Sequence, residues 1–127
     1  MTPIIFINCD DQPFVDQILS ADKILETRTR NMLKSLSGQR VLLAETHRGR
    51  KPIVRASVIL GEAQKVTDKA TFVCFRKITC IQEGSKYDWN DNTKYKYFYT
   101  LLSVRPVEPF TPPEGIRHGR VWMEYGT

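Results

Sequence analysis

The hydrophobic and polar positions in the first part of the chain change their spacing twice. Residues 4–7 form a β-branched and aromatic run that is typical of a strand and stops at a polar turn. Apolar side chains within 14–19 then share one helical face, and Pro13 suits the first turn of that helix. Over 24–30 the period becomes two, which predicts a strand whose charged side chains project from one face.

The middle of the chain has the pattern of a β-hairpin. Apolar runs over 40–46 and 53–60 flank a short loop, 47–52, that contains glycine and proline. Before the hairpin, residues 31–36 have room for one helical turn, and Gly38 breaks the chain before the next strand.

The last part of the chain combines one ambiguous segment with clear strands. Residues 70–81 have both helical spacing and strong β-propensity, and we favour a helix that starts near Thr67-Asp68. Alternation over 94–102 predicts a strand, and 103–109 either continues it or bends away at Pro106. A final strand is expected over 120–125.

These elements predict an α+β fold in a single domain, 1–127. The length suits one hydrophobic core, and the 41% hydrophobic and 26% charged residues are close to average globular usage. Several short strands with two or three helices between them indicate a small closed or nearly closed β-barrel, since closure removes exposed strand edges. The helices would then lie on its periphery.

The charge balance favours a polyanionic partner. Lysine and arginine exceed aspartate and glutamate by 19 to 14, so the formal net charge is +5 and the pI is about 9.2. The most basic loop is the predicted hairpin tip, with Arg48, Arg50 and Lys51. These cations either contact phosphates or serve only solubility. A second basic cluster lies at 117–120.

Several other classes of protein are not indicated. Cys9, Cys74 and Cys80 are odd in number and scattered, and with His47 and His118 they do not have the spacing of a zinc site. We therefore expect neither a metal nor a cofactor. No apolar run is long enough to span a bilayer, and the N-terminal segment lacks a basic region before its short apolar run. A cytoplasmic protein without membrane association is expected.

One segment carries the main functional signal. Lys23, Glu26 and Arg28, preceded by Ala21-Asp22, resemble the G-x-K-x-x-E-x-R signature of the ASCH family, the ASC-1 homology domains related to PUA RNA-binding domains. Ala21 stands where the family usually has glycine. The helix before the signature, the entry into the next strand at 36–43 and the aromatic strand over 95–102 are similar to the family layout as well.

The resemblance implies a PUA-like β-barrel with a basic cleft that binds RNA or a modified nucleoside. Lys23, Glu26, Arg28 and their neighbour Arg30 would line it, with Arg48, Arg50 and Lys51 as further phosphate contacts. Arg28 offers a planar fork of donors, Lys23 a mobile point charge, and Glu26 an acceptor for a nucleobase amine. From the spacing alone, such a strand face would more often be a solvated or self-paired surface.

The alternative is a small hydrolase that acts on acylated cytidines or on RNA with Lys23 and Glu26 as catalytic groups. In the amidohydrolase type of this family a threonine at the acidic position is the nucleophile. Here that position holds Glu26, and strand alternation directs its neighbour Thr27 to the opposite face. Both catalytic roles would require pKa values shifted towards neutrality by burial.

The aromatic residues permit two interpretations. Tyr95, Tyr97 and Tyr99 share one strand face between Lys94 and Lys96, a pattern that could stack bases while cations contact phosphates. More often such a face belongs to the core. We likewise expect Trp89 and Trp122 to be packing residues.

Overall fold

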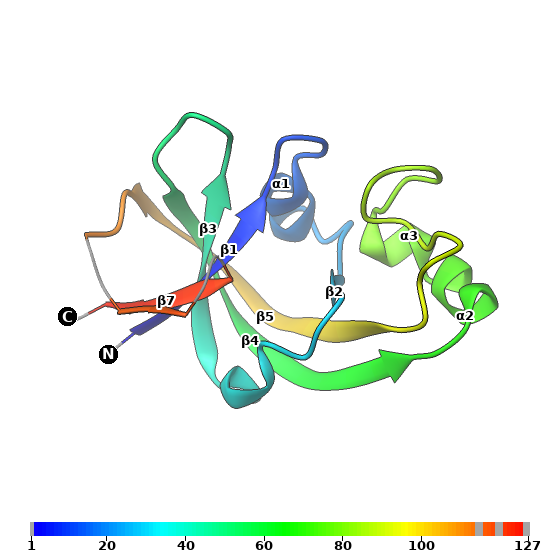
Figure 1. The fold of residues 1–127 in the computed structure, drawn as a ribbon. Helices are drawn as coiled ribbons and strands as arrows, with labels where there is room; N and C mark the ends of the chain where they lie inside the picture. Colours follow the sequence, from blue (N-terminus) through cyan, green and yellow to red (C-terminus); the bar gives the residue numbers. More distant parts are fainter. Residues whose placement is uncertain (1, 114–115, 119–120, 126–127) are drawn as a thin grey trace.

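The computed structural model describes residues 2–113, 116–118 and 121–125, and it contains seven strands and four short helices (Figure 1). The strands are β1 (Thr2–Asn8), β2 (Leu25–Arg28), β3 (Arg40–Thr46), β4 (Ile53–Val66), β5 (Lys96–Phe110), β6 (Ile116–His118) and β7 (Trp122–Tyr125). The helices are α1 (Phe14–Leu19), the 3₁₀ turn η1 (Lys34–Leu36), α2 (Lys69–Cys74) and α3 (Arg76–Thr79).

All seven strands belong to one mixed sheet with the order β2-β5-β4-β3-β1-β7-β6. β1 and β3 are parallel, and the other neighbouring pairs are antiparallel. The predicted α+β class is therefore confirmed. Within the described residues the sheet has two ends, β2 and β6, which do not pair with each other, so the predicted closed barrel is not confirmed.

The central hairpin agrees with the sequence pattern. β3 pairs with β4 from Arg40–Ile59 to Glu45–Ile53, and Gly49 occupies the intervening loop with a φ of +77°. The positive φ favours glycine because it has no Cβ to clash with the neighbouring carbonyl.

β5 is one continuous strand of 15 residues, whereas the sequence left open whether 103–109 continued it. Its register with β4 shifts at three places, and Ser103 has a φ of +48°. Such bulges add local twist and bend the strands. The two strands therefore curve together through the sheet and do not separate at Pro106 (Figure 1).

The segment for which we favoured a helix contains two short ones, α2 and α3. Asp68 caps α2, because its carboxylate accepts a hydrogen bond from the N–H of Thr71 at 2.8 Å. Phe75 separates the helices, and Cys80 ends α3 in the left-handed conformation with a φ of 61°. The helical spacing was correct, but the run is broken after one and a half turns.

The largest core cluster lies between α1 and the concave side of the sheet. It contains Val15 and Ile18 of α1 with Ile5, Leu43 and Val58 of the strands. Tyr99 and Trp122 also belong to this cluster, as expected for packing residues. A second cluster beneath α2, around Phe72 and Phe98, includes the half-buried Trp89 at its edge.

The remaining expectations concern a metal site, a membrane-spanning helix and the basic cluster at 117–120. No three His, Cys, Asp or Glu side chains in the described part of the chain come together as metal ligands. None of the described helices has the length and apolar character that a membrane crossing requires. The basic cluster at 117–120 lies partly outside the described residues. Its first two residues belong to β6, a strand that the sequence did not predict.

Candidate functional site

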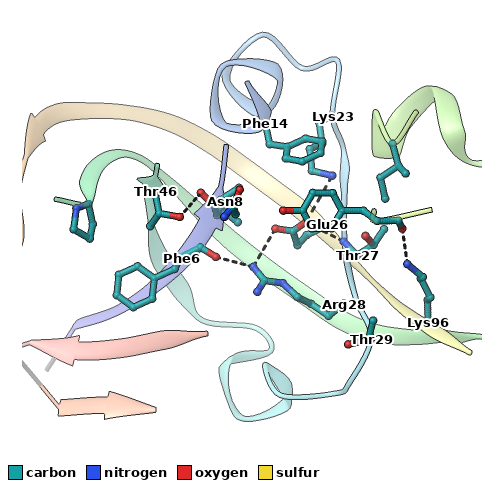
Figure 2. A pocket seen from close by; sticks show the side chains of 14 residues that line it. Phe6, Asn8, Phe14, Lys23, Glu26, Thr27, Arg28, Thr29, Thr46 and Lys96 are labelled. Atoms are coloured by element: carbon teal, nitrogen blue, oxygen red, sulfur yellow. Dashed lines mark hydrogen bonds and ion pairs between the residues drawn. The ribbon is translucent and has the colours of Figure 1, made fainter. Parts of the chain in front are cut away.

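A cavity of about 460 Å³ lies at the seam between β1 and β2 (Figure 2). β7 pairs with β1 from Thr2 to Ile5, and the next N–H of β1, that of Phe6, donates to the Val121 carbonyl at 2.9 Å. The cavity is lined by Phe6, Ile7 and Asn8 of β1, by 26–29 in and after β2, and by Phe14, Lys23, Thr46, Pro52, Ile81, Tyr87 and Lys96.

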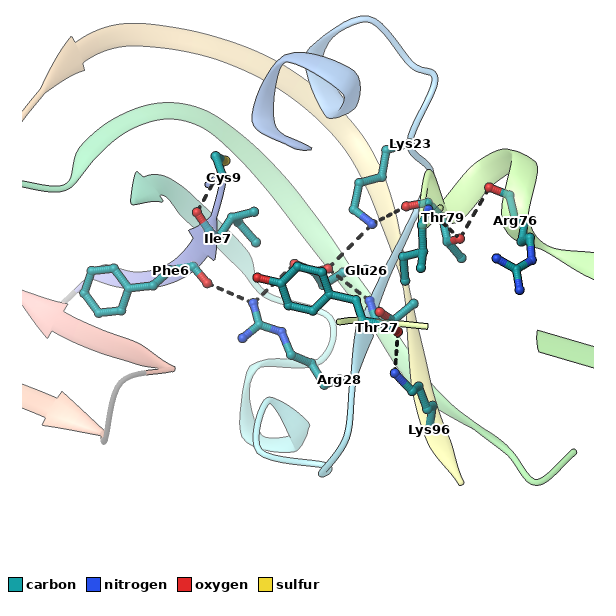
Figure 3. Close-up of polar contacts among 12 residues, drawn as sticks. Phe6, Ile7, Cys9, Lys23, Glu26, Thr27, Arg28, Arg76, Thr79 and Lys96 are labelled. Atoms are coloured by element: carbon teal, nitrogen blue, oxygen red, sulfur yellow. Dashed lines mark hydrogen bonds and ion pairs between the residues drawn. The ribbon is translucent and has the colours of Figure 1, made fainter. Parts of the chain in front are cut away.

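Lys23 is almost entirely inside the protein, with 2% of its surface exposed. Its Nζ donates a hydrogen bond to the Thr79 carbonyl at 2.7 Å and lies 3.7 Å from Glu26 Oε1 (Figure 3). The same Nζ lies 4.7 Å from the centre of the Phe14 ring (Figure 2). Loss of water around the ammonium lowers the pKa of Lys23, although the Glu26 carboxylate opposes that shift. Lys23 was predicted to be a mobile point charge, but its contacts hold the ammonium in one place.

Glu26 is the centre of the polar network. Its Oε2 accepts a hydrogen bond from Arg28 at 3.2 Å, and its Oε1 accepts one from the Thr27 N–H at 3.0 Å. Burial by itself disfavours the carboxylate, but the charges of Arg28 and Lys23 and the Thr27 N–H outweigh it and lower the pKa of Glu26. The side chain is consequently ionised at neutral pH.

Arg28 connects the two strands that border the cavity. Its Nη2 donates to Glu26 and also to the Phe6 carbonyl of β1, at 2.9 Å (Figures 2 and 3). Its other N–H groups make no hydrogen bond to any described residue, and 21% of the side chain is exposed. Arg28 thus crosses the seam and retains donors for a ligand.

The structure brings Glu26 and Arg28 together on one cavity, as the strand period predicted, and Lys23 joins them, as the resemblance implied, but Arg30 does not. Arg30 is exposed and does not line the cavity. β2 ends at Arg28, so the alternation that placed Arg30 on the same face stops one step before it. Arg30 is therefore a charged neighbour of the site and not a part of its wall.

The backbone conformation explains why a small residue, Ala21, precedes Lys23 in the signature segment. Ala21 adopts a φ of 67°, the left-handed region in which glycine is most readily accommodated. This turn leads from α1 to Lys23. Alanine has the smallest side chain after glycine and can adopt this conformation at some cost in backbone strain. The replacement of glycine by Ala21 is therefore compatible with the signature.

Thr27 lies closer to the site than strand alternation suggested. Four consecutive residues, 26–29, line the cavity because the cavity follows the outer edge of β2 and so touches side chains from both of its faces. The Thr27 N–H is already occupied by Glu26. Its side chain is half-buried.

Lys96 and Tyr87 belong to the cavity wall but were not among the site residues predicted from the signature. Lys96 at the start of β5 is buried and donates its Nζ to the Tyr87 carbonyl, and loss of water lowers its pKa. Tyr87 comes from the loop between α3 and β5, and its ring packs against Phe14. The alternation of lysine and tyrosine over 94–99 signalled that Lys96 was unusual. No sequence signal identified Tyr87.

The aromatic strand separates into a core residue and outer residues. Tyr99 is fully buried, and its hydroxyl donates to Asn31 Oδ1 at 2.6 Å. Tyr97 is half-buried, while Tyr95 is exposed and has its ring against Tyr97. None of the three lines the cavity. Of the two interpretations of this face, the core role holds for Tyr99.

The three cations of the hairpin tip lie outside the seam. Arg48, Arg50 and Lys51 are exposed, and none of them forms an ion pair with a described residue. The tip is nevertheless connected to the site, because Pro52 lines the cavity at the seam.

The electrostatic balance of the cavity is positive. Three buried or half-buried cations, Lys23, Arg28 and Lys96, face a single carboxylate, Glu26. Rings of Phe6, Phe14 and Tyr87 form apolar parts of the same wall. Such a site can hold an anionic group together with a flat, polar ring.

The fold and the site together describe an α+β protein with a positively charged cavity between β1 and β2. A scan against protein-family models finds no match, and a search of curated proteins finds no relative. Solved structures share the fold. A crystal structure of a serine-to-alanine variant of an ASCH protein from Zymomonas mobilis aligns with a TM-score of 0.67 and 20% identity over 85% of this chain and 73% of its own.

Two further structures of that ASCH protein agree. A tyrosine-to-phenylalanine variant aligns with a TM-score of 0.66 and 18% identity over 85% of this chain and 75% of its own. A crystal structure of ASCH from Zymomonas mobilis aligns with a TM-score of 0.65 and 18% identity over 85% of this chain and 73% of its own. The chain therefore has the ASCH fold, and the resemblance based on Lys23, Glu26 and Arg28 is confirmed at the level of the fold.

Proposed function

We propose that this protein binds RNA and holds one phosphate and one nucleobase in the cleft between β1 and β2. The observation that supports this most directly is the joint placement of Arg28, Lys23 and Glu26 on one cavity together with aromatic rings. A nucleotide combines an anion, a flat ring and hydrogen-bond donors. Each of these features has a complementary group in the wall.

The size and the unused hydrogen-bonding capacity of the cleft support the same ligand. A volume of about 460 Å³ lies within the range of small-molecule sites and suits one nucleotide. Arg28 has N–H groups that bond to no described residue and can meet a phosphate, and each Glu26 oxygen can accept a further hydrogen bond from a base amine. Phe6, Phe14 and Tyr87 offer apolar contact to the ring.

Binding of a fluorescent single-stranded RNA, followed by anisotropy at low and moderate salt, tests the proposal. We expect affinity to fall as salt rises, because phosphate contacts release counterions. Arg28→Ala should weaken binding by roughly tenfold or more, the loss of a charged hydrogen bond of about 1.5–3 kcal/mol. Arg30→Ala is the matched control, since it removes an exposed arginine outside the cavity. Equal affinities for the two variants would contradict the proposal.

A hydrolase that acts on acylated cytidines or on RNA is the second candidate. The observation in its favour is the lowered pKa of Lys23, whose Nζ lies 3.7 Å from Glu26 inside the cavity. An amine that loses its proton more readily could act as a general base. Against it, Nζ already donates to the Thr79 carbonyl.

Incubation with N4-acylcytidines and with labelled RNA separates the two candidates. The hydrolase requires product that disappears in Lys23→Met, a variant that keeps an unbranched side chain, one heavy atom shorter, and removes the amine. If the unaltered protein binds RNA but forms no product, the hydrolase is ruled out and only the binding function stands.

A further inference from the structure

A second cavity of about 440 Å³ adjoins the first. It lies between the hairpin tip and the segment that follows β5, and its wall consists of Arg50, Lys51, Pro52, Thr111, Pro112, Pro113 and Met123. Pro52 lines both cavities. The two cavities therefore share one residue of their walls.

Among the described residues, the wall of the second cavity is positively charged. Arg50 and Lys51 contribute to it, and no described aspartate or glutamate does. Neither cation is ion-paired among the described residues. Unlike Lys23 and Arg28, they face solvent and are available to an anion.

The backbone that carries these cations is held in place. The Arg48 N–H donates to Asp10 Oδ1 at 2.9 Å, and the Arg50 N–H donates to the His47 carbonyl at 3.1 Å. The His47 ring lies between two carboxylates, 3.8 Å from Asp10 and 3.3 Å from Glu45. A tip fixed in this way loses less conformational freedom when it contacts a ligand.

The other wall of the second cavity suits a flat, weakly polar group. Pro52, Pro112 and Pro113 present saturated rings and have no backbone N–H to be satisfied. Met123, which is buried, adds a polarizable side chain. A sugar or base can lie against such a wall while its phosphate meets Arg50 and Lys51.

We propose that the second cavity is a subsite for an adjoining nucleotide, so that the ligand is a single-stranded RNA segment that passes over Pro52 from one cavity into the other. This inference rests on the proposed function of the first cleft and specifies its ligand. A free nucleoside or mononucleotide fills only the first cavity. A duplex is excluded because a paired and stacked base cannot enter a cavity between two strands.

The experiment compares three probes by isothermal titration calorimetry or anisotropy: the four nucleoside monophosphates separately, a mixed-sequence RNA hexanucleotide, and a blunt RNA duplex of equal length. The variant is the double substitution Arg50→Ala with Lys51→Ala. Its matched control is Lys69→Ala with Lys77→Ala, which removes two exposed cations on α2 and α3 that line neither cavity.

We expect the hexanucleotide to bind at least tenfold more tightly than any monophosphate and more tightly than the duplex. The Arg50 and Lys51 double variant should lose about tenfold in hexanucleotide affinity and retain its affinity for monophosphates. The slope of log affinity against log salt should fall by about 1.4, as expected for two lost phosphate contacts on a single strand. The control double variant should change the slope by much less.

Two different failures are distinguishable. If hexanucleotide binding depends on Arg28 but is unchanged in the Arg50 and Lys51 variant, or is no tighter than monophosphate binding, the second subsite is wrong and the first cleft stands. If neither monophosphates nor the hexanucleotide bind the unaltered protein, or binding ignores Arg28, the proposed function is wrong and the second subsite is rejected with it. A duplex that binds as tightly as the single strand also overturns the inference.

Discussion

The cleft at the β1–β2 seam and the tip of the β3–β4 hairpin are both cationic, but their charges are held in opposite ways. In the cleft, Lys23 and Glu26 are 2% and 7% exposed and share a network with Arg28. At the tip, Arg50 and Lys51 are exposed and unpaired within the described residues. The same residue types therefore perform different physical tasks.

This difference predicts which substitutions change the free energy of unfolding and which change only the affinity for RNA. Buried charges lose their hydration, so each needs its partner, and removal of one partner leaves the other uncompensated. Exposed charges keep their hydration, contribute little to folding and remain free to exchange counterions for phosphates. Substitutions in the cleft should therefore affect folding, and those at the tip should affect only binding.

The largest expected effect follows from removal of the central carboxylate. Glu26→Gln should lower the free energy of unfolding by about 3–5 kcal/mol, because Lys23 remains buried without its counter-charge. Urea denaturation measures the loss. The exposed Glu62→Gln is the control and should change stability by less than about 0.5 kcal/mol.

Addition of Lys23→Met to Glu26→Gln should recover part of that loss, since the uncompensated charge is then removed as well. A single Glu26→Gln variant as stable as the Glu62→Gln control would show that the cleft charges are not coupled, and the contrast with the tip would disappear.

The second effect is the same loss produced by acid. Because Arg28 and Lys23 lower the pKa of Glu26, its ionised form stabilises the folded state above the ordinary glutamate value of 4.5. That contribution is lost as the pH falls below this value and through the lower pKa of the folded state. Urea midpoints of the unaltered protein and of Glu26→Gln, measured from about pH 7 to pH 3, should converge at the acid end.

Asp88 also has a lowered pKa, because the Gly84 N–H and Arg76 outweigh its burial, but it contributes equally to both proteins and cancels in their difference. A difference in midpoint that stays constant down to pH 3 would assign the effect of Glu26 to packing and not to charge.

The third effect concerns the bridge across the seam. Arg28→Ala removes hydrogen bonds to Glu26 and to the Phe6 carbonyl and should cost about 1.5–3 kcal/mol of stability. Arg28→Lys keeps the charge but lacks the planar fork, so we expect an intermediate stability. Denaturation of both variants beside Arg30→Ala measures the series. Similar stabilities for Arg28→Ala and Arg30→Ala would mean that the bridge does not hold the seam.

The smallest effect on folding belongs to the tip. The double substitution of Arg50 and Lys51 by alanine should change the free energy of unfolding by no more than about 0.5 kcal/mol, because both side chains are exposed and unpaired in the described structure. The slope of log RNA affinity against log salt concentration should nevertheless be smaller for this double variant than for the unaltered protein. A double variant that unfolds much more easily would place the tip in the same class as the cleft.

Much of the local structure could be predicted, because short-range periodicity reports on which face of an element is buried. The alternation after Ile24 placed Glu26 and Arg28 together, and the apolar runs beside 47–52 defined the hairpin. The predictions failed where strand alternation no longer applied. Arg30 lies beyond the end of β2, and the cavity runs along a strand edge, which brings Thr27 to it.

The sequence by itself determined most of the elements, the excess of positive charge and the signature residues Lys23, Glu26 and Arg28. Only the tertiary structure decided that these residues form a buried network, because Thr79, Phe6 and Phe14 reach them from other elements. It also added Lys96 and Tyr87 to the cleft and brought Pro52 between two cavities. Desolvation and partner geometry depend on contacts between segments far apart in the chain, and no local period encodes them.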